Sequence, residues 1–282
     1  MEMIFEAAVV GLLQGLTEFI PVSSSAHLEL VPWIFGWGSD DPLIGSLAFD
    51  VFLHLGTLLA LLLYFARDWV RLIGAGVASI RERRIGDDPD RRLAWLLAIA
   101  TVPAAIIGFA FEDLIADLFH GDSNGARLAI ATFLIVGAVA LYLADRLGSR
   151  RRSLHDVTLP AALTIGFSQA LALLPGISRS GATITAGLAL GLDREAAARF
   201  SFLLATPITL GAGLYGARDL LDASLSGGEW VAIWVGFGTA AVSGMLAIGL
   251  LLAWLRRRSV AIFSAYRIAF AVLIIVLVAA GR

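Results

Sequence analysis

The sequence predicts an all-α integral membrane protein with six transmembrane helices and two re-entrant helical hairpins in an inverted-topology repeat. Three observations lead to this fold class. The 282 residues are 59% hydrophobic and only 16% charged, whereas soluble domains are about 45–50% apolar and about 25% charged. Apolar stretches recur along the whole chain, and two of them are interrupted at their centres by proline and serine. Similar motifs in the two halves indicate an internal repeat.

Six stretches of the chain are long and apolar enough to cross a bilayer as helices, which takes roughly 20 residues. They lie near 47–66, 94–111, 126–145, 199–216, 230–254 and 262–280. We expect a loop over residues 67–92, between the first two spans. We also expect Arg267, near the start of the last span, to extend its side chain to the cytoplasmic surface.

Two further apolar stretches, 3–36 and 157–191, are too polar at their centres for a simple span and too long for a loop. Such segments are typical of re-entrant hairpins, whose broken backbone is tolerated where protein buries it or where it lines a wet cavity. We therefore expect the two breaks to meet in a polar cavity inside the membrane.

The distribution of arginine orients the spans. Arginines gather in 67–92, 146–152 and 256–258, whereas the charged residues of 112–125 and 217–229 are mostly acidic. Because cytoplasmic loops carry an excess of basic residues, the three arginine-rich segments are predicted to be cytoplasmic. This assignment alternates consistently over all six spans. It places the first hairpin on the outer side and the second on the cytoplasmic side.

An internal repeat divides the single membrane domain, residues 1–282, into halves 1–147 and 155–282. The segment VGLLQGL at 10–16 is similar to IGFSQAL at 165–171. After a shift of one residue, Pro21 aligns with Pro175 and Ser24 with Ser178; further on, LGT at 55–57 aligns with LAT at 204–206. Each half holds one hairpin and three spans. Because three is odd, the second half is predicted to be inserted upside down, as in many transporters.

The interruption near Pro21 in the first hairpin, called here the first break, carries a group of residues that could form a catalytic site. Gln14 and Glu18 are four residues apart and share a helix face, and an ionised carboxylate inside an apolar segment costs roughly 2.5–3.5 kcal/mol, which favours a functional role. Candidate residues then follow at Ser23, Ser24, Ser25 and His27. A hydroxyl, an imidazole and a carboxylate near a helix break are typical of a nucleophile site. The open alternative is that the serines only cap a helix and that the histidine is structural.

The second break resembles an anion site. Arg179 lies deep within an apolar segment, where a cation needs an anionic partner or water. Hydroxyls, backbone amides and the start of a helix accompany it at Ser178, Ser180, Gly181 and Thr183. A guanidinium offers bidentate donors to phosphate oxygens. The alternative is a structural pair between Arg179 and Glu18, which would itself bring the two hairpins together.

Other features are less informative or exclude whole classes of function. Asp50 and His54 are four residues apart and either line the same cavity, bind a metal or pair with each other. The chain has no cysteine, which excludes disulfides and cysteine metal sites. The arginines flank apolar segments and form no basic domain, so no nucleic-acid partner is expected.

The motifs QGLTEFIPVSSSAH at 14–27 and PGISRSGAT at 175–183 closely resemble those of the undecaprenyl-diphosphate phosphatase family, also called bacitracin-resistance proteins. The resemblance extends to FLLATP at 202–207 and AYR at 265–267, and it covers nearly the whole chain. Two departures are visible. Gln14 replaces a more common glutamate, and Ser25-Ala26 replaces a common Thr-Gly.

The resemblance implies an enzyme of the cell membrane that hydrolyses undecaprenyl diphosphate to the monophosphate with the help of Mg²⁺ or Ca²⁺. This reaction recycles the lipid carrier of cell-wall precursors and confers resistance to bacitracin. The family's essential residues correspond to Glu18, Ser24, His27 and Arg179, with Glu18 and Gln14 as metal ligands. The active site is expected to open to the outer face, among membrane lipids, and a homodimer is an open expectation.

Two questions stay open at this point. The first is whether Ser24 or His27 attacks the phosphate; if Ser24 attacks, His27 is its base or the proton donor. Glu18 either binds the metal or serves as the base. A different class of function is a transporter that moves a polyprenyl phosphate or another anion, which an inverted repeat favours.

Overall fold

The computed structural model describes residues 1–37, 43–119, 123–221 and 225–281. Over these residues the chain forms α-helices and two short 3-10 helices, without a β-strand. In the first half the helices are α1 (Glu2–Phe19), α2 (Ser24–Phe35), α3 (Leu47–Tyr64), α4 (Ala66–Arg81), α5 (Pro89–Phe119) and α6 (Asn124–Leu147). In the second half they are η1 (Leu154–Asp156), α7 (Leu159–Ala170), η2 (Leu171–Leu173), α8 (Arg179–Ala189), α9 (Arg194–Leu221), α10 (Gly227–Leu255) and α11 (Ala261–Ala279).

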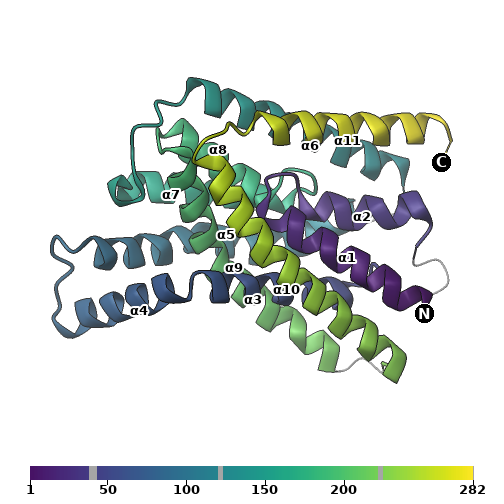
Figure 1. The fold of residues 1–282 in the computed structure, drawn as a ribbon, viewed down its shortest axis with the longest axis horizontal. Helices are drawn as coiled ribbons and strands as arrows, with labels where there is room; N and C mark the ends of the chain where they lie inside the picture. Colours follow the sequence, from purple (N-terminus) through teal and green to yellow (C-terminus); the bar gives the residue numbers. More distant parts are fainter. Residues whose placement is uncertain (38–42, 120–122, 222–224, 282) are drawn as a thin grey trace.

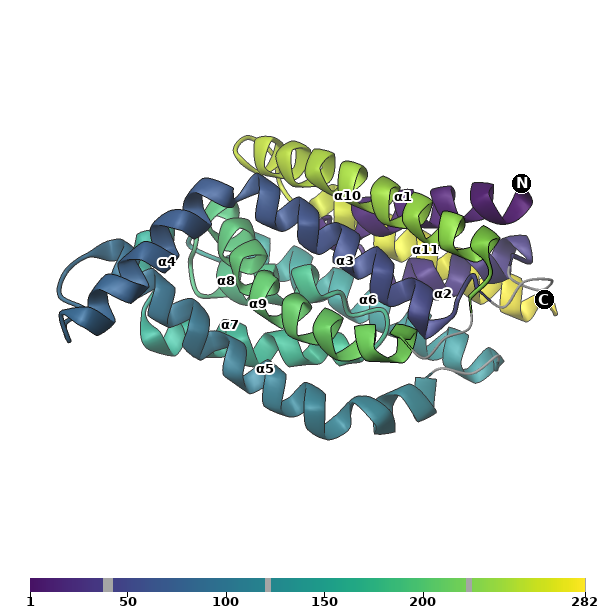
Figure 2. The same cartoon turned by 90° about the horizontal axis from the view of Figure 1, so that it is seen from below.

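The helices confirm an all-α, multi-pass membrane protein. In the described part of the chain, α5, α6, α9, α10 and α11 are each long and apolar enough to span a bilayer. A sixth span is formed if α3 and α4 are taken together, but the two helices meet at an angle of 77° (Figure 2). The six predicted spans therefore correspond to α3, α5, α6, α9, α10 and α11.

The expected loop over 67–92 is wrong, because α4 occupies most of it. Its exposed apolar residues, Val70, Ile73, Val77 and Ile80, recur every three or four positions. This spacing places them on one helix face. The density of arginine in this stretch is typical of a loop, but the spacing of its apolar residues is typical of a helix.

The two broken segments form helical hairpins, whereas their re-entrant insertion in the membrane stays a prediction. In the first hairpin α1 runs into the bundle and α2 returns, and in the second α7 and α8 do the same. The two hairpins enter from opposite ends of the bundle, and their breaks meet near its middle (Figure 1). The helices α1 and α8 are in contact there. Two segments about 155 residues apart in the sequence thus form one internal site.

Packing between the halves follows the repeat. The helix α1 packs against α10, and its counterpart α7 packs against α5. Gly11 and Gly166, which the repeat aligns, make these approaches close: a Cβ at Gly11 would lie 2.3 Å from the Gly236 carbonyl oxygen, and one at Gly166 would lie 2.1 Å from that of Ala100. Small residues of this kind let membrane helices approach each other. This pattern supports related halves, whereas their opposite insertion stays a prediction.

The structure corrects the repeat alignment at the breaks. Ser23 and Ser178 are the N-cap residues of α2 and α8, with φ angles of 78° and 72°. Each hydroxyl accepts a hydrogen bond from the backbone N–H three residues later. Ser178 therefore corresponds to Ser23 and not to Ser24. Because Gln14 and Gln169 already align at the same spacing, no shift of one residue is needed before the serines.

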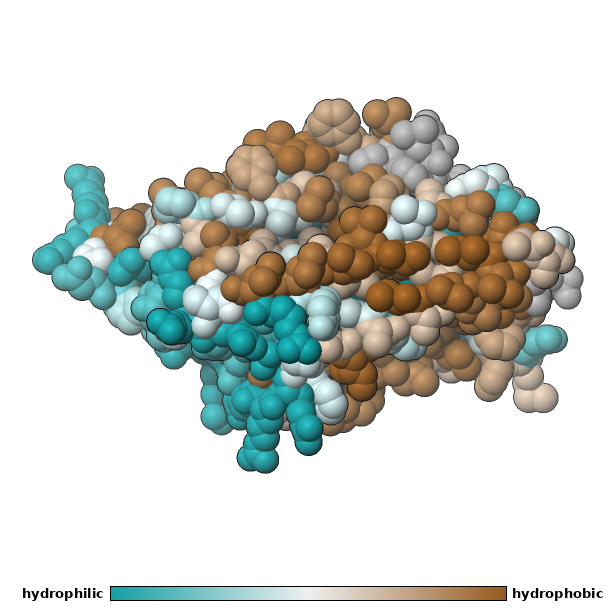
Figure 3. Space-filling view, turned by 90° about the horizontal axis from the view of Figure 1, so that it is seen from above, coloured by the Kyte–Doolittle hydropathy of each residue, from teal (hydrophilic) through white to brown (hydrophobic). Residues whose placement is uncertain are grey.

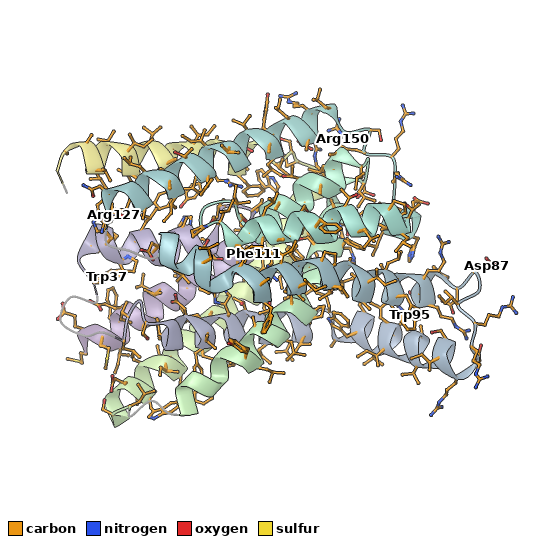
Figure 4. The ribbon with its side chains drawn as sticks, turned by 180° about the vertical axis from the view of Figure 1, so that it is seen from behind. Trp37, Asp87, Trp95, Phe111, Arg127 and Arg150 are labelled. Atoms are coloured by element: carbon orange, nitrogen blue, oxygen red, sulfur yellow. The ribbon has the colours of Figure 1, made fainter. Side chains whose placement is uncertain are left out.

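The two ends of the bundle differ in polarity. Hydrophilic residues gather at the end where α4 lies, and hydrophobic residues cover much of the rest of the face in Figure 3. Asp87 and Arg150 lie at this end, opposite Trp37 and Arg127 (Figure 4). The positive-inside rule predicts that it faces the cytoplasm. The acidic residues expected in the outer loops at 122 and 222 lie outside the described residues.

Candidate active site

The carboxylate of Glu18 is the centre of the polar cluster between the breaks. The residue is 6% exposed, in the last turn of α1. Its Oε2 accepts a hydrogen bond of 2.6 Å from the Ser24 hydroxyl and one of 3.2 Å from the Gln14 amide. Gln14 lies one turn earlier on the same helix face, as its spacing predicted. An ionised carboxylate this deeply buried requires such donors.

Arg179 completes the cluster from the other hairpin. Its guanidinium donates to Glu18 Oε1 and forms an ion pair with it. A second N–H donates to Thr209 Oγ1 of α9 at 2.9 Å. The contact between Glu18 and Arg179 joins residues that are 161 positions apart and holds the two breaks together. The Arg179 side chain is 16% exposed, so its position is shielded from bulk water.

Both breaks present the start of a helix to this cluster. Ser24 is the first residue of α2, and Arg179 is the first residue of α8. The preceding residues, Ser23 and Ser178, adopt positive φ angles, which are uncommon for residues other than glycine and are often found at functional sites. Helix N-termini carry free N–H groups and partial positive charge. The cluster thus combines one guanidinium and two positive helix ends, an arrangement suited to a phosphate.

His54 of α3 also reaches the cluster. Its Nε2 lies 3.8 Å from Glu18 Oε2, and its Nδ1 contacts the backbone carbonyl of Asp50 at 2.8 Å. The side chain is 38% exposed, which makes it the most open of these groups. Of the alternatives for Asp50 and His54, the structure favours a histidine that lies beside Glu18.

His27 is hydrogen-bonded to other partners. Its Nδ1 contacts the Ser23 carbonyl at 2.7 Å, and its Nε2 contacts the Tyr266 hydroxyl at 2.7 Å. The ring is 1% exposed and stacks on Phe270 with centroids 4.5 Å apart. In the described part of the chain, Ser24 donates to Glu18 rather than to His27. Nε2 thus links the start of α2 to α11, whereas the Nδ1 contact stays within the start of α2.

The remaining predicted residues shape the breaks. The hydroxyls of Ser23 and Ser25 lie 3.2 Å apart, and those of Ser178 and Ser180 repeat this contact at the same distance. Gly181 donates its N–H to Ser178 at 3.1 Å. Thr183 lies one turn after Arg179 in α8, and its hydroxyl contacts that of Ser201 at 2.6 Å.

Arg267 contradicts its predicted position at the cytoplasmic surface. The residue is 0% exposed, and its guanidinium donates to the carbonyls of Gly176 and Ile177 at 2.8 and 2.9 Å. Glycines at 137 and 181 leave room for it: a Cβ at either position would lie 2.1 or 2.9 Å from its nitrogens. The side chain is long enough to reach a surface, but carbonyls of the second break lie within hydrogen-bonding distance.

Sequence reasoning missed three partners of the site. Thr209 and Ser201 are hydroxyl residues of the apolar helix α9, and nothing in their spacing marked them. Tyr266 belonged to a recognised motif, but its contact with His27 joins residues 239 positions apart. Only an alignment that pairs distant positions could have found it.

The residues that could hold a cation are few. Mg²⁺ and Ca²⁺ take oxygen ligands, and the cluster offers the carboxylate of Glu18 and the Gln14 Oε1, which is buried without a hydrogen-bond partner in the described residues. Groups of three or more acidic or histidine ligands do not occur among the described residues. The predicted pair, Glu18 and Gln14, therefore fits a cation whose other ligands come from water or a bound phosphate.

Comparisons with known proteins agree with these motifs. A family model described as bacitracin resistance protein BacA matches residues 7–273. A relative from Thermomicrobium roseum, called undecaprenyl-diphosphatase, is 45% identical over 99% of both chains. Relatives of the same name are 46% identical in Pelobacter propionicus, over 94% of this chain and 93% of the other, and in Desulforudis audaxviator, over 97% of both. The chain therefore belongs to the bacitracin-resistance family, BacA.

Proposed function

We propose that the protein is an undecaprenyl-diphosphatase, which hydrolyses undecaprenyl diphosphate to the monophosphate and inorganic phosphate. The observation that carries this function is the contact of Glu18 with both Ser24 and Arg179, because it unites a hydroxyl, a carboxylate and a phosphate-binding cation between two helix N-termini. The names of the relatives support the same reaction. Recycling of the lipid carrier for cell-wall synthesis would follow from it.

Arg179 and the starts of α2 and α8 bind the diphosphate in this proposal. Negative charge accumulates on the transferring phosphoryl group, so positioned cations and N–H groups supply most of the rate. The fork of Arg179 suits two phosphate oxygens. Its present partner, Glu18, is a carboxylate whose place a phosphate oxygen can take when substrate binds. The polyprenyl tail then lies between the spans, beside membrane lipid.

Ser24 is the proposed nucleophile and Glu18 its base. The Ser24 oxygen attacks the terminal phosphorus, its proton passes to Glu18 Oε2, and the bond from phosphorus to the bridging oxygen breaks. Undecaprenyl phosphate leaves, and water then hydrolyses the phosphoserine. The short hydrogen bond between the two side chains supports these roles. His27 keeps α2 in place through Ser23 and Tyr266, and a direct attack by Nε2 of His27 would require its hydrogen bond with Tyr266 to break.

Mg²⁺ or Ca²⁺ fits this site as a cation shared between protein and substrate. Glu18 and the free Gln14 oxygen would hold it, together with phosphate oxygens. Bound there, the cation would neutralise charge on the phosphates. We further propose that the protein lies in the cell membrane, oriented as the arginine distribution indicates. We also propose that this site opens to the outer face, as the family resemblance implies.

A transporter of polyprenyl phosphate is the second candidate, because the hairpins enter from opposite ends of the bundle (Figure 1). Release of phosphate from undecaprenyl diphosphate by the purified protein in detergent separates the two, since transport is impossible there. We expect release by the wild type and none by Ser24→Ala. No release by the wild type, with or without Mg²⁺ or Ca²⁺, would contradict the phosphatase.

A further inference from the structure

The last helix, α11, contacts both hairpin breaks. On one side, the Tyr266 hydroxyl contacts His27 Nε2 at 2.7 Å, and Phe270, one turn later, stacks on the same ring. On the other side, Arg267 donates to the carbonyls of Gly176 and Ile177 in the second break. Neighbouring residues of one helix thus hold two loops that belong to different halves of the chain.

The guanidinium of Arg267 is enclosed between α6, α8 and α11. Besides the second break it contacts α6, where it donates to the carbonyls of Leu134 at 3.2 Å and Phe133 at 3.5 Å. The close fit depends on glycine, because a Cβ at Gly137 would lie 2.1 Å from Nη2 and one at Gly181 would lie 2.9 Å from Nη1. Its geometry is therefore set on several sides at once.

The partners of Arg267 are unusual for a cation inside a membrane protein. Such a cation normally faces a carboxylate or water. In the described part of the chain no carboxylate lies within ion-pair distance of Arg267, and its hydrogen bonds go to backbone carbonyls. Hydrogen bonds from a charged donor are about twice as strong as neutral ones. They orient the peptide groups of Gly176 and Ile177. These groups immediately precede Ser178, whose φ is 72°, and Arg179 follows it.

We propose that α11 positions the catalytic groups of the two breaks relative to each other, with Arg267 as the positioning residue for Arg179. Arg267 fixes the Gly176–Ile177 carbonyls, and so fixes where α8 begins and where Arg179 points. Tyr266 and Phe270 fix His27, and so fix where α2 begins and where Ser24 lies. This role rests on the proposed phosphatase function, but its structural part is measurable without substrate.

The experiment disturbs Arg267 in two independent ways. Arg267→Met removes the donors. Gly137→Ala keeps them but places a methyl group where Nη2 lies, so that the guanidinium must leave its carbonyls. Gly238→Ala, on α10, is the matched control, because a Cβ there has no atom within 4 Å. Each full-length protein is purified in detergent, and amide exchange over residues 174–182 is measured beside kcat and KM for undecaprenyl diphosphate.

We expect both variants to speed amide exchange at the second break by about tenfold or more. We also expect kcat/KM to fall by about tenfold or more, because Arg179 is misplaced. Melting temperatures should fall much less than activity does. The double variant should resemble Arg267→Met alone, since the three atoms nearest to a Cβ at Gly137 all belong to the arginine. Gly238→Ala should match the wild type in exchange and in kinetics.

Wild-type exchange at 174–182 in folded Arg267→Met and Gly137→Ala would overturn the positioning role. Faster exchange with unchanged kcat and KM would also overturn it, because the arginine would then stabilise the break without aligning Arg179. If Arg267→Met does not fold, Gly137→Ala decides alone. A wild type that releases no phosphate contradicts the phosphatase, whereas the exchange data still test whether Arg267 holds the break.

Discussion

Removing the guanidinium of Arg179 tests its role in binding phosphate. Arg179→Ala takes away the N–H groups that contact Glu18 and Thr209. The loss of one positioned donor to a developing oxyanion costs about 10²–10³ in rate, and a guanidinium at a transferring phosphoryl group is worth about 10³–10⁵. We therefore expect kcat/KM for undecaprenyl diphosphate to fall by at least about a hundredfold.

The same substitution leaves the Glu18 carboxylate buried without its cation. Breaking a buried ion pair by removing one partner costs about 3–5 kcal/mol of stability. Ser24 and Gln14 still donate to Glu18, so the lower end, about 3 kcal/mol, is expected. Adding Glu18→Gln removes the unpaired charge. The double variant should therefore regain thermal stability and stay inactive.

Thermal unfolding and phosphate release, measured on the same detergent preparations, test both parts. Arg179→Lys is the matched control, because it keeps the charge but lacks the planar fork; it should stay near wild type in stability and recover only part of the activity. Near wild-type hydrolysis by Arg179→Ala would refute the assigned phosphate site. A double variant less stable than Arg179→Ala would refute the charge argument.

Three further predictions concern the metal, the topology and the turn before α7. Gln14→Glu should lower the Mg²⁺ or Ca²⁺ concentration for half-maximal phosphate release, because a second carboxylate joins the ligands; unchanged metal dependence would place the cation elsewhere. A cysteine in place of the exposed Glu2 should react with an impermeant thiol reagent from outside the cell. A cysteine in place of the exposed His155 should react only after the membrane is permeabilised. Labelling of both from outside would exclude opposite insertion. Hydrogen bonds from Ser153 lower the pKa of Asp156. The turn is therefore stabilised at pH values above the ordinary aspartate pKa, and it loses that stability as the pH falls through the lowered pKa. Amide protection of residues 153–156 should fall in that pH range in the wild type and stay constant in Asp156→Asn.

Much of the architecture could be predicted because bilayer physics leaves strong signals in sequence. Span length and apolarity identified α3, α5, α6, α9, α10 and α11, and proline with serine inside apolar stretches identified the hairpins. The pairing of Glu18 with Arg179 could also be anticipated. Each charge inside the membrane needs a partner, and few other charged residues occur in the apolar segments.

Most errors arose where a side chain forms hydrogen bonds with backbone atoms or with a distant helix. Arg267 could reach a surface by length alone, and only the fold shows the carbonyls of Gly176 and Ile177 beside it. Ser24 was aligned with Ser178 because both follow a proline, whereas the shared feature of Ser23 and Ser178 is a positive φ. The helix α4 was hidden because its arginines masked the apolar spacing. Backbone geometry and distant contacts are absent from a single sequence, whereas the apolar spacing of α4 is present in it.

The most direct test of the proposed chemistry is a search for the phosphoenzyme. Undecaprenyl diphosphate labelled in its terminal phosphate is mixed with purified protein, and the reaction is stopped with a denaturing detergent at neutral pH during the first turnover. Separate samples are then treated with acid or with base, and the labelled peptide is identified. We expect acid-stable label on the peptide that contains Ser24, and none after Ser24→Ala. Base-stable, acid-labile label that survives in Ser24→Ala and is lost in His27→Ala would contradict Ser24 as the nucleophile.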